Sequence, residues 1–179
     1  MGENHLNVYS ARPFSRAEPQ LPQGYTFRLW RPTLRNVLPP TLGARFRLWT
    51  VAHYFRLFHN RDYAVLLIVN AEGEPVHRSC LVPSYFRWPF MGRNDLQISS
   101  TWTTPNERRK GLATAALVKA MAIMDCPDRK FWYITRESNM ASIAACGRAG
   151  FSFVGLGQRV NWMGVRLLGH VRLDGQQHC

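Results

Sequence analysis

The sequence has few lysines and few acidic residues, and it has no hydrophobic run long enough for a membrane-spanning protein. Of its 23 basic residues only Lys110, Lys119 and Lys130 are lysines, against 11 acidic residues, so arginine carries the net charge of +12. The longest uninterrupted apolar run, residues 63–69, is far shorter than the roughly 20 residues that cross a bilayer. Residues 1–23 are polar and contain no apolar signal core. These features predict a soluble, cytoplasmic protein with no membrane partner.

Metal and disulfide sites are not expected either. The four cysteines have no short paired spacing, and the six histidines include no His-x-x-x-His pair, so free thiols and no metal are predicted. The arginines are spread along the chain and do not form one block. This distribution favours nucleotides, coenzyme phosphates or acidic carrier proteins as partners, and nucleic acid is not an expected one.

A chain of 179 residues suits one domain with a hydrophobic core. Residues 1–24, with three prolines among polar residues, are predicted to form a loosely ordered N-terminal arm, and residues 25–179 a single domain. Apolar periodicity and chain breakers predict strands at residues 25–31, 62–70, 76–82, 95–103, 130–135, 151–156 and 165–173, and helices at 42–58, 112–124 and 139–149.

Two aromatic-rich stretches admit two interpretations each. The helix predicted at residues 42–58 carries arginines among its rings. It either folds over the sheet, which we favour, or contacts a membrane surface. The rings of residues 83–93 either fill the core or line a pocket, and we favour a pocket.

The most informative stretch is Arg108-Arg109-Lys110-Gly111-Leu112-Ala113-Thr114, between a Thr/Ser-rich extended segment and an unbroken helical run. The first backbone N–H groups of a helix have no intrahelical partner, and the helix dipole adds partial positive charge at the same place. Gly111 lets the backbone approach a bulky anion, and three cationic side chains surround it. The residues therefore predict a pyrophosphate-binding turn.

The order of elements, with Arg-x-x-Gly-x-Ala after the fourth strand, resembles the GNAT superfamily of acyl-CoA N-acyltransferases. Residues 105–113 are similar to the family's Arg/Gln-x-x-Gly-x-Gly/Ala signature. Asn139-Met140-Ala141-Ser142-Ile143, followed by Gly150-Phe151, is similar to its second coenzyme motif. The resemblance implies an α/β fold whose mixed, mostly antiparallel sheet has six to seven strands, is splayed between strands 4 and 5, and is flanked by about four helices.

The resemblance also implies acetyl-CoA as co-substrate. The backbone amides of residues 109–113 would hold its pyrophosphate, and the edge of the fourth strand would pair with its pantetheine arm. A backbone N–H near Thr103 would stabilise the developing oxyanion. The residues implied to bind the coenzyme are Thr101, Trp102, Thr103, Arg108, Arg109, Lys110, Gly111, Leu112, Ala113, Thr114, Asn139 and Ser142.

The residues that move protons are less clearly indicated. Many members of the family use a tyrosine seven residues after the motif asparagine as general acid, and this sequence has Cys146 there. A thiol, with a reference pKa of about 8.5 against about 10 for tyrosine, suits proton donation to a thiolate. Alternatively, Cys146 packs as a small apolar residue. As general base, His77 is the first candidate and Asp95 the second, and Tyr133 is a further one acting through a water.

The resemblance thus implies an N-acetyltransferase that passes an acyl group directly to a primary amine of a small molecule, as a monomer or homodimer. The stretch from residue 77 to residue 103 is similar to bacterial GNATs of amino-sugar and surface-polysaccharide pathways, which implies an amino sugar or nucleotide-linked amino sugar as acceptor. A peptide, a protein or a small polyamine is the alternative acceptor. An acyl-CoA-binding module without catalysis and, from the charge alone, a nucleic-acid-associated protein are the alternative functions.

Overall fold

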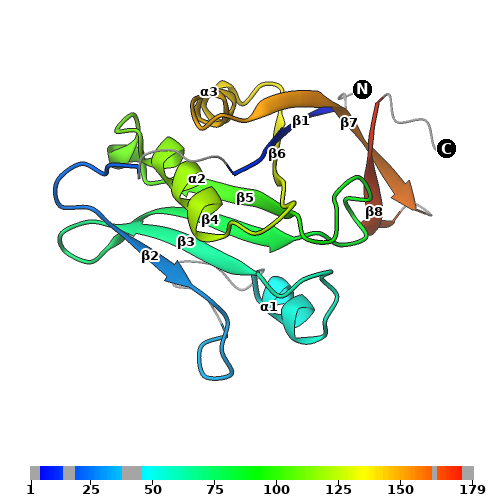
Figure 1. The fold of residues 1–179 in the computed structure, drawn as a ribbon, viewed down its shortest axis with the longest axis horizontal. Helices are drawn as coiled ribbons and strands as arrows, with labels where there is room; N and C mark the ends of the chain where they lie inside the picture. The colour runs from blue at the N-terminus through cyan, green and yellow to red at the C-terminus, as the bar shows by residue number, and fades with distance from the viewer. Residues whose placement is uncertain (1–4, 14–18, 38–45, 163–164, 175–179) are drawn as a thin grey trace.

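The computed structural model describes residues 5–13, 19–37, 46–162 and 165–174. Within these residues one eight-stranded sheet has the order β2-β3-β4-β5-β6-β1-β7-β8, and all neighbouring strands are antiparallel except β5 and β6 (Figure 1). The predicted mixed, mostly antiparallel sheet is confirmed. The elements are β1 (His5–Ala11), β2 (Thr26–Trp30), α1 (Arg47–Tyr54), β3 (Ala64–Val69), β4 (Pro75–Pro83), β5 (Leu96–Thr103), the 3-10 turn η2 (Pro105–Glu107), α2 (Leu112–Ile123), β6 (Phe131–Arg136), α3 (Met140–Arg148), β7 (Ser152–Trp162) and β8 (Val165–Leu173).

β1 raises the number of strands above the six or seven predicted, and the prediction of a loosely ordered arm is wrong for these residues. β1 lies inside the sheet, antiparallel to β6 on one side and to β7 on the other (Figure 1). Val8 is fully buried, and it packs over Gly157 of β7, where a Cβ would lie only 3.1 Å from Val8 Cγ2. The strand was missed because its partners lie at the other end of the sequence and because inner strands lack clear polar alternation.

α2 and α3 cover one face of the sheet. On this face Leu117 and Ala120 of α2 are fully buried in one hydrophobic cluster with Leu66 of β3 and Ile98 of β5. The helix contacts β3, β4 and β5, as expected for a helix that is apolar nearly all round. Among the described residues there are three α-helices, fewer than the four or so expected, and none is long and apolar enough to cross a membrane.

α1 and the loop between β4 and β5 cover the opposite face. The ring of Trp49 stacks on Phe58 with centroids 6.1 Å apart and meets Tyr85 edge-on at 5.5 Å. Helix α1 is shorter than the predicted 42–58, and residues 42–45 lie outside the described residues. Tyr85 and Trp88 of the loop are buried in the second hydrophobic cluster. The aromatic loop therefore mainly fills the core, contrary to the pocket we favoured, although Phe86 is 57% exposed.

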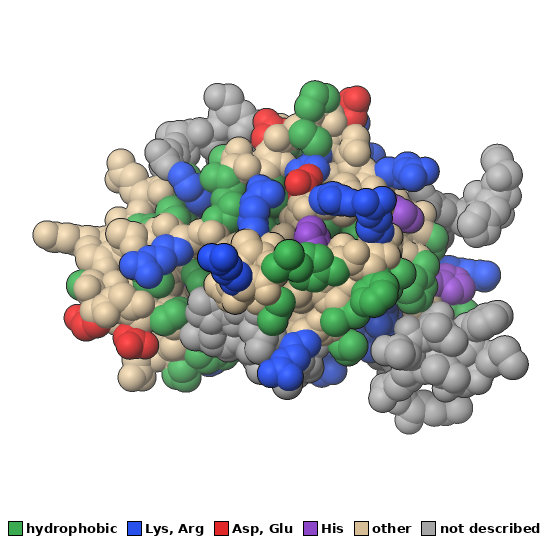
Figure 2. All heavy atoms as spheres, turned by 90° about the horizontal axis from the view of Figure 1, so that it is seen from below, with side chains coloured by type: hydrophobic (Ala, Val, Ile, Leu, Met, Phe, Trp, Pro, Cys, Tyr) green, Lys and Arg blue, Asp and Glu red, His purple; other side chains and the backbone are tan. Residues whose placement is uncertain are grey.

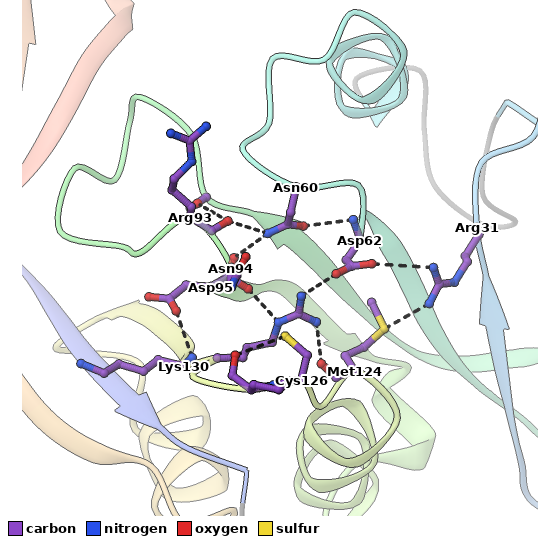
Figure 3. Close-up of polar contacts among 12 residues, drawn as sticks. Arg31, Asn60, Asp62, Arg93, Asn94, Asp95, Met124, Cys126 and Lys130 are labelled. Atoms are coloured by element: carbon purple, nitrogen blue, oxygen red, sulfur yellow. Dashed lines mark hydrogen bonds and ion pairs between the residues drawn. The ribbon is translucent and has the colours of Figure 1, made fainter.

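The buried Arg129 connects the end of α2 to the starts of β3 and β5, and Figure 3 shows its partners Met124, Asp62 and Asn94. Arg129, whose side chain is 5% exposed, donates to Asn94 O at 2.7 Å, to Met124 O at 2.5 Å and to Asp62 Oδ2 at 2.5 Å. Charge-assisted hydrogen bonds of this kind are stronger than neutral ones. The cluster fixes the closed end of the sheet, far from the end of β5 where the chain turns into α2.

The sheet opens between β5 and β6, as predicted for strands 4 and 5. Residues 96–98 of β5 pair in parallel with residues 131–133 of β6, and no pairing between the two strands continues beyond them in the described chain. β5 continues along β4 to Thr103, while β6 continues along β1 to Arg136. We refer to the divergence after Ile98 and Tyr133 as the fork.

Candidate active site

A β-bulge lies on β5 just beyond the fork. Ser100 and Thr101 stand together opposite the single residue Ser79 of β4, and Ser100 has a φ of 51°. A bulge bends its strand and redirects the side chains that follow it. As a result Thr101 and Thr103 lie on the same face of the sheet as His77, which is the β4 partner of Thr103.

After β5 the chain turns through η2 and begins α2 at Leu112. Arg109 and Gly111 both have left-handed backbone, with φ of 65° and 78°. The first bond of the helix runs from Ala115 N to Gly111 O at 3.0 Å, and in the described chain the amides of residues 109–114 donate to no backbone carbonyl. We call this segment, residues 108–114, the cradle. Its unpaired amides and the positive end of the helix dipole suit an anion.

Two observations test whether the coenzyme's diphosphate fits the cradle. A Cβ placed on Gly111 would meet no atom within 4 Å, so open space lies in front of the backbone there. Thr114 Oγ1 is buried without a hydrogen-bond partner, and buried polar groups normally have one. Leu112 is buried and anchors the helix, so it and Ala113 offer only backbone. The residues fit an anionic group.

The cationic side chains of the cradle do not all face an open site. Lys110 Nζ donates to Glu107 Oε2 at 2.8 Å and to Tyr25 OH at 2.9 Å, and the Tyr25 hydroxyl also donates to Glu107. The bond to Glu107, followed by that to Tyr25, raises the pKa of Lys110 to about 12, and the bond from Lys110 lowers the pKa of Glu107. Lys110 therefore fastens the turn to Tyr25. The sequence had predicted a free cation beside the anion.

Arg108 and Arg109 remain exposed on the cradle. Arg108 Nε donates to Thr103 O at 3.3 Å, which directs this carbonyl away from β4. The following amide, that of Thr104, donates to Val76 O at 2.9 Å on β4. Because successive residues of a strand direct their backbone groups to opposite edges, the Thr103 amide faces the open side of β5.

A buried chain of hydrogen bonds runs through His77. Its Nδ1 lies 2.8 Å from Thr103 Oγ1 and its Nε2 lies 3.0 Å from Ser79 Oγ, which in turn lies 3.4 Å from Thr101 Oγ1. His77 is 1% exposed. Burial, with a smaller contribution from the charge of Arg78, lowers the pKa of His77 to about 4, so the imidazole is neutral at neutral pH. The structure thus joins the first candidate base to two of the residues implied to bind the coenzyme.

Asp95, the second candidate base, lies elsewhere and has a structural role. Its Oδ2 accepts from Gly92 N and from Trp132 Nε1, each at 2.7 Å, and its Oδ1 accepts from Lys130 N at 3.0 Å. It is 4% exposed at the start of β5, and roughly 25 Å of extended backbone separates it from Thr103. Asp95 accepts three hydrogen bonds and is far from Thr103. It therefore stabilises the starts of β5 and β6.

Tyr133 and Cys146 both belong to the hydrophobic cluster under α2 and α3. Tyr133 is the last residue of β6 that pairs with β5, so it marks the fork, and its ring meets Phe151 edge-on at 6.1 Å. Cys146 is fully buried on α3, and burial raises the pKa of its thiol to about 12. A thiol without contact with solvent favours the packing interpretation of Cys146 over proton donation.

Asn139 and Ser142 are joined by a hydrogen bond at the start of α3. The Asn139 side chain caps the helix by accepting from Ser142 N at 3.2 Å. Such a cap satisfies one of the free amides of a helix N-terminus. Asn139 is exposed and Ser142 half-buried, so both lie near the surface shortly after the end of β6.

Trp102 points to the other face of the sheet. It pairs with Arg78, whose guanidinium lies 4.8 Å from the centroid of the Trp102 ring. The ring is 38% exposed. This places Trp102 on the α1 side of the sheet, opposite the face that carries His77 and Thr103.

Sequence reasoning missed Ser79, Arg78 and Tyr25. Ser79 had a usable signal, because His77 and Ser79 are two residues apart on a strand and therefore share a face. Arg78 had a similar signal, because a residue between His77 and Ser79 on a strand lies on the opposite face of the sheet. The contact of Tyr25 with Lys110 had none, because it joins distant parts of the chain.

The comparisons with known proteins agree with this fold. The Acetyltransferase (GNAT) family matches residues 26–151, and the chain belongs to this family. Solved structures with a similar fold include a GCN5-related N-acetyltransferase from Sphaerobacter thermophilus, with 17% identity, a TM-score of 0.53 and 85% of this chain covered. A protein from Drosophila is similar with 17% identity, a TM-score of 0.57 and 86% covered.

This chain spans 49% and 48% of the length of those two proteins. A GNAT-family acetyltransferase from Novosphingobium aromaticivorans has 16% identity, a TM-score of 0.51, and 86% of this chain and 61% of that chain covered. No curated protein sequence matches the chain. At these identities the solved structures support the fold, while the family match supports membership.

Proposed function

We propose that the protein is an acetyl-CoA-dependent N-acetyltransferase that acts by direct transfer to a primary amine. The observation that carries this is the cradle, where the amides of residues 109–114 donate to no backbone carbonyl in the described chain, directly after a strand that has left its neighbour at the fork. The cradle suits a diphosphate, and the edge of β5 suits an extended arm that pairs like a further strand.

Bound acetyl-CoA would supply the acyl group as a thioester. The Thr103 amide, which faces the open side of β5 beyond the fork, would donate to the oxyanion. In the transfer an N–C bond forms, the C–S bond breaks, the amine loses a proton and the coenzyme's thiolate gains one. Preorganised donors of this kind contribute most when the site excludes water, and the buried side chains of His77 and Ser79 next to Thr103 favour that.

We assign the amine's proton to the chain of hydrogen bonds through His77. Thr101 and Thr103 are half-buried at the ends of this chain and His77 is buried at its centre, so a proton taken at a threonine hydroxyl would pass to the imidazole. The imidazole is neutral at neutral pH, so a ring nitrogen can accept that proton, and its pKa of about 4 makes it a weak base that passes the proton on. Tyr133 pairs with Ile98, roughly 16 Å of extended backbone before Thr103, so we assign the proton returned to the thiolate to water.

The acceptor we propose is an amino sugar or a nucleotide-linked amino sugar. The support is Trp102 with Arg78 stacked on it, beyond the fork and on the face opposite the cradle. An exposed aromatic ring packs on a sugar or base face, and an adjacent guanidinium favours a diphosphate. A polyamine would use the same ring differently, since it brings no anionic group for Arg78, and a peptide would bring a carboxylate in place of a diphosphate.

The main test of the proposal measures coenzyme A binding by calorimetry in Gly111→Gln and in the matched control Gly73→Gln. Both glycines have positive φ, 78° and 81°, and a Cβ at either meets nothing within 4 Å. Both variants therefore incur a similar backbone strain of about 1 kcal/mol. We expect Gly111→Gln to weaken binding at least about tenfold because its side chain enters the cradle, and Gly73→Gln to bind as the wild type does.

Equal binding by both glycine variants, or no binding by the wild type, contradicts the proposal. A thiol-release assay with amino sugars, nucleotide-linked amino sugars, polyamines and peptides then separates the remaining possibilities. Release with sugar amines supports the proposed acceptor, and release with peptides or polyamines alone replaces it. Coenzyme binding without release from any amine indicates a binding module without catalysis.

A further inference from the structure

The α1 side of the molecule combines positive charge with exposed apolar side chains, and neither the cradle nor the fork uses them. Between Glu18 and Asp62 the sequence contains no acidic residue. Over the same stretch it contains seven arginines: Arg28, Arg31, Arg35, Arg45, Arg47, Arg56 and Arg61. A stretch this long with charges of one sign only is attractive to an anionic surface along its whole length.

Helix α1 and the turn after it present apolar side chains to the outside. Leu48, Val51 and Phe55 are 64%, 46% and 74% exposed, and Leu57 is 59% exposed. Residues three or four positions apart lie on one face of a helix, so Leu48, Val51 and Phe55 form an outward row. Trp49 lies on the inner side, against Phe58. The outward row is therefore additional to the side chains that hold α1 on the sheet.

Arginines border this row. Arg47, Arg56 and Arg61 are exposed, and with Leu48, Val51, Phe55 and Leu57 they make up what we call the α1 surface. Figure 2 views the molecule from the side on which α1 lies, and it shows apolar side chains with Lys and Arg side chains between them across the middle of that side.

We propose that the α1 surface docks on an anionic lipid bilayer. Exposed leucine and phenylalanine side chains enter the boundary between headgroups and acyl chains, while arginines beside them pair with lipid phosphates. The absence of acidic residues in the stretch removes the repulsion that a negatively charged surface would otherwise meet. The inference is independent of acyl transfer, because none of these residues belongs to the cradle or the fork.

Two other occupants are less consistent with these residues. A second copy of the chain would bring the arginines of two α1 surfaces face to face, and like charges in contact disfavour an interface. An acidic protein would satisfy the arginines, but it would require a preformed complement for the projecting Leu48 and Phe55. A bilayer requires only that these side chains be exposed, which they are.

The test is flotation of the full chain with vesicles of phosphatidylglycerol and phosphatidylcholine in equal parts, beside vesicles of phosphatidylcholine alone. We expect binding to the anionic vesicles that weakens as salt is added, and little binding to the neutral ones. Leu48→Gln and Phe55→Gln should each reduce partitioning about tenfold or more. Arg47→Gln and Arg61→Gln should each reduce it about fivefold.

Two controls match these variants elsewhere on the molecule. Phe153→Gln changes a phenylalanine that is 56% exposed on β7, and Arg172→Gln changes an exposed arginine on β8. Both should partition as the wild type does, and all variants should keep coenzyme binding and thermal stability. No binding to anionic vesicles overturns the proposal, and so does an equal loss in the controls, which would indicate diffuse charge. Dissociation of a dimer by Phe55→Gln without vesicle binding also overturns it, in favour of a second copy.

Discussion

Burial acts on the candidate acids and bases in opposite directions, because it disfavours whichever form carries charge. It lowers the pKa of His77 to about 4 and raises that of Cys146 to about 12. Both groups are therefore neutral near pH 7. His77 nevertheless touches two hydroxyls that lead toward the site, whereas Cys146 belongs to the core cluster. At the scale of single residues, access to the site distinguishes the two more clearly than the pKa does.

The lowered pKa of His77 predicts a pH dependence of stability. The unfolded chain, with a histidine pKa of about 6.5, takes up the proton more readily than the folded chain, whose value is about 4. Stability from this group is complete above about pH 6.5 and falls as the pH is lowered toward 4, by on the order of 3 kcal/mol. Urea unfolding of the wild type and of His77→Gln across this range measures it, and the variant should lose the corresponding part of the slope.

The same variant tests the proton path. His77→Gln should lower kcat by about a hundredfold or more while leaving coenzyme A affinity unchanged, because general base catalysis contributes that much. An unchanged kcat would limit His77 to positioning Thr103, and a parallel fall in coenzyme affinity would indicate a structural defect of β4.

For Cys146 the expected outcome is retained activity. Cys146→Ala removes a buried sulfur and should cost about 1 kcal/mol in the free energy of unfolding, with kcat within about threefold of the wild type. Denaturant unfolding and the thiol-release assay measure the two quantities. A loss of turnover in a variant that still folds and binds coenzyme would restore the thiol as the proton donor.

At the scale of elements, the fork depends on how firmly the other end of β5 is held. Arg129 holds that end by bonds to Asn94 and Asp62, and Asp95 holds it by accepting from Trp132. β5 and β6 pair for three residues only, so these contacts, and not a long ladder, fix their relative position. The sequence offers Asp95 as a base because an acidic residue before a strand carries no sign of the three donors that arrive from other parts of the chain.

Asp62 makes two ion pairs of different strength, which allows a matched comparison. Asp62→Ala leaves the buried Arg129 without its carboxylate and should cost about 3 kcal/mol. Arg31→Ala removes the exposed partner at 4.0 Å, whose side chain is 51% exposed, and should cost less than about 1 kcal/mol. Thermal or denaturant unfolding of both variants decides the matter, and similar costs would mean that the Arg129 contacts do not stabilise the closed end.

The elements that the sequence predicted well are those with local signals. The apolar helix α2, the buried strand β3 and the Gly111 turn all follow from residues adjacent in the chain. The contact of Lys110 with Tyr25 could not be predicted because the two are remote in the sequence, and the face that Trp102 takes depends on the bulge at Ser100. Local chemistry thus predicted the cradle, while the contacts that orient its side chains depend on the assembled sheet.

At the scale of the whole molecule, β1 makes the N-terminal segment part of the sheet, where the sequence predicted a loosely ordered arm. Its place between β6 and β7 makes residues 5–11 part of the sheet, and the amides of β1 should exchange with solvent as slowly as those of β6.

Val8→Thr tests the same point by stability. Val8 is fully buried, so an added hydroxyl without a partner should cost about 1–3 kcal/mol. The matched change Val154→Thr, at a position 45% exposed on β7, should stay within about 0.5 kcal/mol of the wild type. Equal effects of the two changes in denaturant unfolding, or rapid exchange of the β1 amides, would contradict the structure of β1.

The position of β1 also has a consequence for synthesis on the ribosome. β1 is translated before both of its neighbours in the sheet, and it can pair with neither until β6 and β7 have been made. Until then it is an unpaired apolar segment of the kind that chaperones bind. We expect this last closure, and not the formation of the hairpin β3–β4, to limit how fast the newly made protein acquires its native sheet.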